Sequence, residues 1–273
     1  APLSSFGQGL SSETLNGLNL RNIGPATMSG RIVDLAVVEK DPFIIYAASS
    51  TGGVWKTINN GVTFEPVFEN EATHSVGAIA VHQGNPDHVW VGTGERANRQ
   101  SSSWGDGVYK STDAGKTWKN MGLKDSHHVG RIVLHPTDPN IVYVAAMGHL
   151  WGPNEERGLY KSTNGGDTWE RIIHVDENTG VVDIAMDPSN SDILYSATYQ
   201  RRRRPYGFHG GGPGSSLRKS TDGGKTWKEI RNGFPEGEFG RIGISIYRSN
   251  PNIVYASVEQ GFQYNASNAY KER

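Results

Sequence analysis

Hydrophobic residues in this chain come in short runs that alternate with polar positions and are separated by turn residues. Runs such as GRIVDLAV from Gly30, VGAIAVH from Val76 and FGRIGIS from Phe239 have the length of β-strands. Gly, Pro, Asn and Asp stand between the runs, where they favour turns. No stretch shows sustained helical periodicity. The pattern predicts an all-β protein made of many short antiparallel strands.

An eight-residue turn motif returns four times, and it sets the period of the strands. The copies are TINNGVTF (57–64), STDAGKTW (111–118), STNGGDTW (162–169) and STDGGKTW (220–227), and their starts lie 54, 51 and 58 residues apart. Each copy combines a short polar side chain, a glycine and a final aromatic, which together are typical of a tight hairpin. The polar positions are Asn59, Asp113, Asn164 and Asp222, and the tryptophans are Trp118, Trp169 and Trp227.

Each period also holds a strand pair before the motif and one strand on either side of it. Four short antiparallel strands in roughly 50 residues predict a β-propeller blade. We expect an irregular lead-in over residues 1–17 and a propeller over 18–273. The blades are expected at about 30–70, 76–121, 129–173 and 181–231, with a partial fifth at 239–273.

Four and a half blades leave two ways to complete the ring. The chain is either the N-terminal part of a larger propeller or a five-bladed ring closed by residues 19–25. We favour the larger propeller, because the segment after Val258 resembles the variable loops that precede a third strand.

Composition narrows the range of partners. The 273 residues carry a net charge of −1 and include 35 glycines and 13 prolines. The sequence contains no cysteine. Disulfides and thiolate chemistry are thereby excluded, and no global charge favours a nucleic acid. No apolar run is long enough to span a membrane. The first residue is Ala rather than Met, and together with the lack of cysteine this favours a bacterial protein that is secreted, periplasmic or on the cell surface.

The motif is similar to the Asp-box, or BNR, repeat of sialidases, sortilin-type domains and several glycosidases. Phrases along the chain, including GGVWKT at Gly52, GDGVYKSTDAGKTW at Gly105 and HVGRIVLHP at His128, resemble a bacterial family of exported, sortilin-like proteins. Members are often labelled glycosyl hydrolases on repeat similarity alone. The resemblance implies an exported propeller and supplies no catalytic residues.

The boxes themselves are predicted to be structural. Two of the four polar positions are Asn, which cannot act as a general acid. One carboxylate per box is also too few ligands to predict a cation. We therefore expect the box side chains to fix turns and the box aromatics, Phe64 among them, to pack between adjacent sheets. No cofactor and no metal site are expected.

Ligand binding is expected on the opposite face, where the connections between strands two and three are long. These connections carry Trp104, Trp151 and Tyr206, whose rings suit stacking on sugars or peptides. Innermost strands of alternate blades begin with Arg31, Arg131 and Arg241. The three guanidiniums either converge on an anion or pair with carboxylates of neighbouring blades, and we favour the pairing.

Candidates for catalysis or for other binding sites lie in the same connections. Glycoside hydrolysis needs two carboxyl groups, and the available ones are Glu95, Asp106, Glu155 and Glu156. Adjacent His127 and His128 point to opposite sides of an extended segment, so both are not expected to bind one metal. The run Arg201–Arg204 is expected to be a solvated or ion-paired loop.

Two functions remain open from the sequence. The first is a non-catalytic binding or assembly module for a glycan, peptide or partner protein, including the remainder of a larger propeller or another subunit. The second is a glycosidase-like hydrolase with carboxylates at the mouth of the central channel. We favour the first, because the sequence does not indicate any two residues as a catalytic pair.

Overall fold

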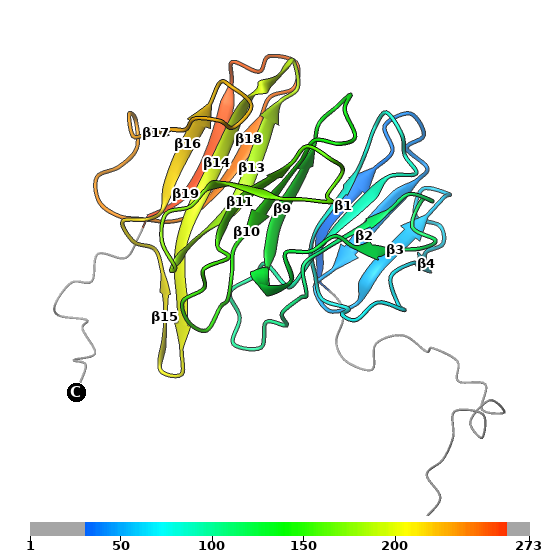
Figure 1. Cartoon of the computed structure of the whole chain (residues 1–273), viewed down its shortest axis with the longest axis horizontal. Helices are drawn as coiled ribbons and strands as arrows, with labels where there is room; N and C mark the ends of the chain where they lie inside the picture. Colours follow the sequence, from blue (N-terminus) through cyan, green and yellow to red (C-terminus); the bar gives the residue numbers. More distant parts are fainter. Residues whose placement is uncertain (1–30, 261–273) are drawn as a thin grey trace, which may run out of the picture.

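The computed structural model describes residues 31–260, which form antiparallel sheets that follow one another along the chain (Figure 1). Blades 1 to 3 each have four strands in sequence order. Blade 1 comprises β1 (Ile32–Val37), β2 (Ile45–Ser49), β3 (Gly53–Thr57) and β4 (Glu65–Pro66). Blade 2 comprises β5 (Val76–Val81), β6 (Val89–Thr93), β7 (Val108–Ser111) and β8 (Lys119–Asn120). Blade 3 comprises β9 (Val129–Leu134), β10 (Val142–Ala146), β11 (Gly158–Ser162) and β12 (Glu170–Ile173). A 3-10 turn, η1 (Lys124–Ser126), precedes β9.

Blade 4 has the same four-stranded path and a projecting hairpin. Its strands are β13 (Thr179–Asp187), β14 (Asn190–Arg204), β16 (Ser216–Ser220) and β17 (Lys228–Ile230), and β15 (Gly207–Gly210) pairs with the far end of β14. Blade 5 consists of β18 (Phe239–Ile246) and β19 (Val254–Gln260). The predicted propeller of about four and a half blades is therefore confirmed. The predicted lead-in at 1–17 lies outside the described residues.

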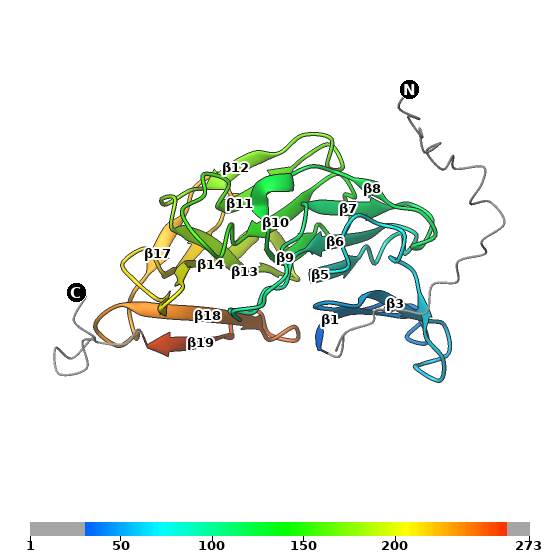
Figure 2. The same cartoon turned by 90° about the horizontal axis from the view of Figure 1, so that it is seen from below.

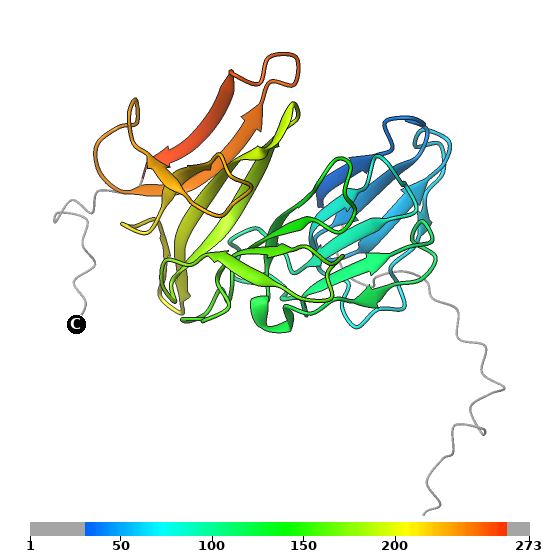
Figure 3. The same ribbon diagram turned by 45° about the horizontal axis from the view of Figure 1, so that its top comes forward.

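Blades 1 and 5 lie at the two ends of an arc of sheets (Figure 2). A gap separates their ribbons (Figure 3). Within residues 31–260, no strand of blade 5 pairs with a strand of blade 1. An ion pair of 2.6 Å between Arg248 and Glu39 links the β18–β19 turn to the segment after β1. The arrangement is that of a partial propeller, as expected. The segment 19–25, invoked for the closure of a five-bladed ring, lies outside the described residues.

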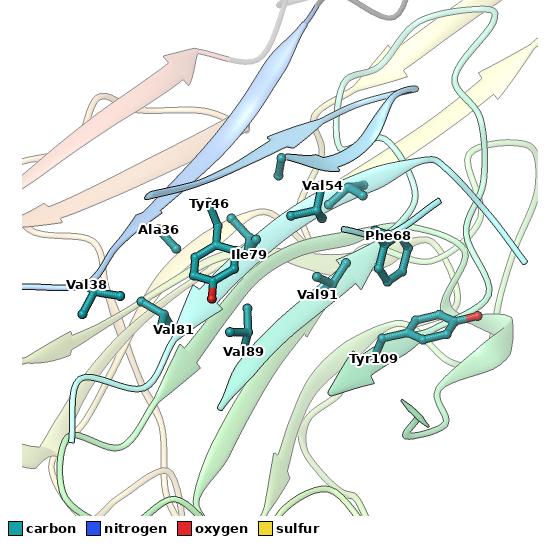
Figure 4. Close-up of a cluster of buried hydrophobic side chains, with 12 residues drawn as sticks. Ala36, Val38, Tyr46, Val54, Phe68, Ile79, Val81, Val89, Val91 and Tyr109 are labelled. Carbon is teal, nitrogen blue, oxygen red and sulfur yellow. The ribbon is translucent and has the colours of Figure 1, made fainter. Parts of the chain in front are cut away.

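Buried side chains form a separate cluster between each pair of successive blades. Tyr46, Val54 and Phe68 of blade 1 meet Val91 and Tyr109 of blade 2 (Figure 4). Equivalent clusters join blades 2 and 3, 3 and 4, and 4 and 5. Each fully buried Val, Leu or Phe stabilises the fold by about 1.5–3 kcal/mol. The alternating apolar positions of the strands thus place the hydrophobic core between blades.

Each turn motif closes its hairpin with the same hydrogen bonds. In blade 2, Asp113 Oδ1 accepts from Thr117 N at 2.9 Å and from Ser111 Oγ at 2.7 Å, and Oδ2 accepts from Thr117 Oγ1 at 2.6 Å. In blade 1, Asn59 Oδ1 accepts from Thr63 N at 2.9 Å, and Nδ2 donates to Thr63 Oγ1. The glycines that follow have φ between 87° and 97°, where a β-carbon is strained. These contacts give the box side chains a turn-fixing geometry.

The two kinds of box predict different responses to acid. Hydrogen bonds from Thr117 and Ser111 lower the pKa of Asp113 to about 2, whereas an unfolded aspartate has a pKa of about 3.9. Because the folded pKa is the lower one, the carboxylate stabilises the fold above about pH 4 and loses that contribution as the pH falls through 2. The double variant Asp113→Asn and Asp222→Asn should keep its Tm at pH 7 within about 2 °C. We expect its Tm to fall less than that of the wild type between pH 5 and pH 2, measured by circular dichroism. A large loss of Tm at pH 7 would show that the amide cannot replace the carboxylate, contrary to Asn59.

The box aromatics pack less completely than expected. Trp118, Trp169 and Trp227 are half-buried rather than fully buried. Trp118 Nε1 donates to Val67 O at 2.6 Å and Trp169 Nε1 to Met121 O at 2.8 Å, so each indole rests on the preceding blade. Phe64 is 43% exposed.

The run Arg201–Arg204 is not a solvated loop. It forms the end of β14 and pairs with β15, so the connection expected to be irregular is a β-hairpin that projects from the sheet (Figure 1). Arg201 is fully buried, donating to Asn98 Oδ1 at 2.8 Å and to Gly148 O at 3.0 Å. Tertiary contacts with the loops of blades 2 and 3 thus override the polar character of the run.

Candidate functional site

The connections between strands two and three, and between one blade and the next, meet on one face of the propeller, which we call the loop face. Trp104 of blade 2, Trp151 of blade 3 and Tyr206 of blade 4 lie in these connections with exposed fractions of 66%, 49% and 73%. Exposed aromatic rings on a rigid scaffold are suited to stacking on apolar faces of sugar rings. The structure therefore leaves the three predicted aromatics available to a ligand.

The loop face is held together by hydrogen bonds between loops of different blades. Asn98 of the blade 2 loop accepts from Arg201, donates from Nδ2 to Tyr199 Oη at 2.9 Å, and offers its backbone carbonyl to Arg203 at 2.6 Å. Arg203 also lies over the ring of Phe208 in β15. These contacts fix the hairpin of blade 4 against blade 2.

A second buried arginine organises the loop of blade 3. Arg157 Nη1 donates to Met147 O at 2.7 Å, and Nη2 donates to His149 O at 2.6 Å and to Gly152 O at 3.1 Å. Burial lowers the pKa of Arg157 to about 10, which leaves the guanidinium charged at neutral pH. Its charge-assisted bonds hold the loop that carries Trp151. Sequence reasoning missed this residue, because nothing in NEERGLYKS distinguishes it from a surface arginine.

Asp106, one of the predicted catalytic candidates, is hydrogen-bonded to Tyr109, and its charge acts on a second carboxyl group, Glu71. Asp106 Oδ2 accepts from Tyr109 Oη at 2.6 Å, and Oδ1 is buried without a hydrogen-bond partner among the described residues. Burial raises the pKa of Glu71, and the nearby charge of Asp106 raises it further. Burial and the bond to Asp106 also raise the pKa of Tyr109 to about 12, so its hydroxyl stays a donor. Glu71 was not a sequence candidate, because its position 35 residues before Asp106 gives no sign that the two charges interact.

Glu95 has a buried and paired environment. Its side chain is 1% exposed and forms an ion pair with Arg31, and its backbone carbonyl lies 2.8 Å from His128 Nδ1. Burial raises the pKa of Glu95, and Arg31 acts in the opposite direction. The geometry makes Glu95 a group that joins blade 2 to the start of blade 1.

Glu155 and Glu156 are adjacent but differ in surroundings. Glu155 is exposed, and its backbone carbonyl accepts from Arg171. Glu156 is half-buried, and burial raises its pKa with a further contribution from the charge of Asp125.

The three arginines that begin innermost strands do not converge on one anion site free of carboxylates. Arg31 pairs with Glu95, while Arg131 lies 3.3 Å from Asp34 and 3.1 Å from Asp183. Arg241 donates to the backbone carbonyl of Arg96 at 3.2 Å. Carboxylates of neighbouring blades thus neutralise two of the three, and the third caps a carbonyl.

The Asp boxes and the strand order define the chain as a β-propeller of the Asp-box class. The family model described as Sortilin-Vps10 (sortilin, neurotensin receptor 3) matches residues 106–271, which is more than half of the chain. The chain belongs to the Sortilin-Vps10 family. In the part that the structure describes, no helix has the length and apolar character needed to cross a membrane.

Relatives of known name align along most of the chain. A xyloglucanase of Paenibacillus sp is 25% identical over 262 residues, covering 87% of this chain and 24% of that protein. The xyloglucanase Xgh74A of Acetivibrio thermocellus is 23% identical over 291 residues, covering 93% of this chain and 32% of that protein. The chain spans about a quarter to a third of the length of these curated relatives.

Solved structures share the fold. A GH74 enzyme of Niastella koreensis matches with a TM-score of 0.61 and 21% identity, covering 84% of this chain and 34% of that chain. The GH74 xyloglucanase of Xanthomonas campestris matches with a TM-score of 0.59 and 19% identity, covering 86% and 35%. These likenesses show the propeller architecture.

The named relatives correct the preference for a non-catalytic module. Proteins that align with 87% and 93% of the chain are xyloglucanases by name, which supports the glycosidase alternative derived from the sequence. The preference failed for a physical reason. It depended on finding no carboxylate pair in the sequence, and residue spacing alone does not show that the charge of Asp106 acts on Glu71.

Proposed function

We propose that the chain is part of a glycoside hydrolase that acts on xyloglucan. The observation that carries the proposal is the alignment of named xyloglucanases along 87% and 93% of the chain. The loop face supports it, since exposed aromatic rings and paired carboxyl groups are what a polysaccharide-cleaving site requires. Fold alone would not suffice, because propellers host many unrelated functions.

In this proposal the loop face binds the glycan. Trp104, Trp151 and Tyr206 stack on sugar rings, and the network around Asn98 and Arg201 keeps the loops in place before the ligand arrives. Rings that are ordered in advance lose little conformational entropy on binding. A polysaccharide does not cross a cell membrane, so the proposal agrees with the expected bacterial export.

Among the candidate carboxyl groups, Asp106 and Glu71 match the two chemical roles best. A glycosidase needs one protonated carboxyl group as general acid and one carboxylate as base or nucleophile. Burial and the charge of Asp106 raise the pKa of Glu71, which suits a general acid, and Asp106 Oδ2 accepts a hydrogen bond from the Tyr109 hydroxyl. Glu71 is therefore assigned as the acid and Asp106 as the base or nucleophile. Glu95 and Arg31 are assigned a positioning role, because their charges are already paired.

Replacement of Trp104 by Ala should weaken the binding of xyloglucan oligosaccharides about 2- to 10-fold, the range expected for one aromatic contact. Isothermal titration calorimetry on the full-length protein measures this affinity. Phe43→Ala is the matched control, because Phe43 is 57% exposed but lies in the β1–β2 turn on the other face. Equal affinities of the two variants would remove Trp104 from the proposed glycan surface.

A further inference from the structure

Two histidines and an aspartate from different loops come together on the loop face. Asp125 lies in η1, His127 follows that turn directly, and His149 lies in the loop after β10. Asp125 Oδ1 is 3.0 Å from His149 Nε2 and 3.6 Å from His127 Nε2. One ligand atom from each residue lies within 4.8 Å of the other two. Sequence reasoning compared His127 with its neighbour His128 and did not pair it with His149.

We propose that Asp125, His127 and His149 form a binding site for a divalent transition-metal ion of the Zn²⁺ type. Imidazole nitrogens and a carboxylate oxygen are ligands that Zn²⁺ prefers. Two ligand atoms about 2.0–2.1 Å from a tetrahedral Zn²⁺ lie about 3.3 Å apart. The two distances from Asp125 Oδ1 lie on either side of that value.

The local backbone directs His127 toward this cluster. Leu123 before η1 is in the left-handed helical region with φ 55° and ψ 39°, and His127 has φ 53° and ψ −39°, so both have a positive φ that non-glycine residues rarely adopt. The strained turn is held by Gly105 N, which donates to His127 O at 2.7 Å. A conformation of this kind persists only where surrounding contacts hold it, and it is common at binding sites.

Groups around the cluster orient the ligands. Asn154, which is buried, donates from Nδ2 to Asp125 Oδ2 at 3.0 Å. The other carboxylate oxygen, Asp125 Oδ1, is the one that lies near the histidines. Outer groups of this type commonly fix the carboxylate of a metal site. The three ligand atoms of Asp125, His127 and His149 leave a fourth tetrahedral position for water or another ligand.

Metal binding requires a small rearrangement of the rings. The His127 and His149 rings are stacked with centroids 3.6 Å apart and an interplanar angle of 21°. Their Nε2 lone pairs converge on one ion once the rings turn about their side-chain bonds, with each ring proton carried on Nδ1. Asp125 is 57% exposed, which gives an ion a route from solvent.

The metal would couple two blades beside the glycan surface. The ion would join the connection between blades 2 and 3 to the loop of blade 3, and the Trp104 ring stacks on His127 at 5.9 Å. Because the His127 ring turns on binding, occupancy would change its contact with Trp104. The site is inferred from ligand geometry alone and does not depend on the substrate proposed above.

The experiment is calorimetric titration of ZnCl₂ into the full chain after treatment with EDTA. We expect one Zn²⁺ per chain, and we expect His149→Ala to weaken its binding more than about 100-fold, beyond the 10- to 100-fold expected for the outer residue in Asn154→Ala. His209→Ala is the control, because it removes an exposed imidazole from β15 and should leave Zn²⁺ affinity unchanged.

A second measurement protects the test against misfolded variants. Co²⁺ bound in a tetrahedral site absorbs in the visible range, and this absorption should appear in the wild type and be lost in His127→Ala. Circular dichroism then establishes that the variants are folded. Absence of Zn²⁺ binding by the wild type, or unchanged affinity in folded His149→Ala, would overturn the proposal.

Discussion

Replacement of Asp106 by Asn in the full-length protein is expected to lower kcat/KM on xyloglucan by about 10²- to 10⁴-fold, the usual contribution of a catalytic acid or base. Asp106 presents one buried carboxylate oxygen without a partner among the described residues, while its other oxygen is held by Tyr109. The amide keeps the size of the side chain but removes the charge. Reducing-end release under initial-rate conditions measures the loss.

Glu71→Gln should reduce the rate to a similar degree if Glu71 is the acid. The control is Glu170→Gln, an exposed carboxylate on β12, which should leave kcat/KM unchanged. Because burial and Asp106 raise the pKa of Glu71, the loss of activity on the alkaline side should begin at a higher pH than for an ordinary glutamate. Full activity in Asp106→Asn would show that the reaction uses other carboxyl groups.

Arg157→Met is the substitution expected to cost most stability. The guanidinium donates to backbone carbonyls of Met147, His149 and Gly152, and methionine would leave these acceptors in a buried loop without donors. An unsatisfied buried acceptor costs about 1–3 kcal/mol, so a total loss of about 3–5 kcal/mol in the free energy of unfolding is expected. Urea denaturation followed by tryptophan fluorescence measures it.

The matched control is Arg248→Met, because Arg248 is exposed and forms a surface ion pair with Glu39. Such pairs contribute about 0–1 kcal/mol. If Arg157→Met and Arg248→Met lower the free energy of unfolding by the same small amount, the buried arginine is not what holds the loop face in place.

The architecture was predictable because its determinants are local. Each turn motif contains its own hydrogen-bond acceptor at Asn59 or Asp113 and a following glycine with positive φ. The spacing of the motifs then gives the blade period without knowledge of tertiary contacts. Burial of the box tryptophans was overestimated, since the sequence shows which residues face a neighbouring blade but not how much of each ring that blade covers.

The candidate site was predictable only in its general location. Long connections indicated the loop face and its aromatic residues, Trp104 among them. The partners that give the carboxyl groups and imidazoles their chemistry come from other blades: Glu71 beside Asp106, and His149 beside His127. Those contacts depend on the path of each loop, which leaves no periodic signal in the sequence. The prediction that Arg201 lies in a solvated or ion-paired loop was wrong, because the sequence of a charged run does not show that its first residue is buried.

Hydrolysis of xyloglucan by the full-length protein tests the central claim most directly. The protein, purified beside its Asp106→Asn variant, is incubated with xyloglucan, and new reducing ends and soluble oligosaccharides are quantified over time. We predict steady release by the wild type and a rate at least about 100-fold lower in the variant. A wild-type protein that is folded and binds the polysaccharide, yet releases no reducing ends, would contradict the account.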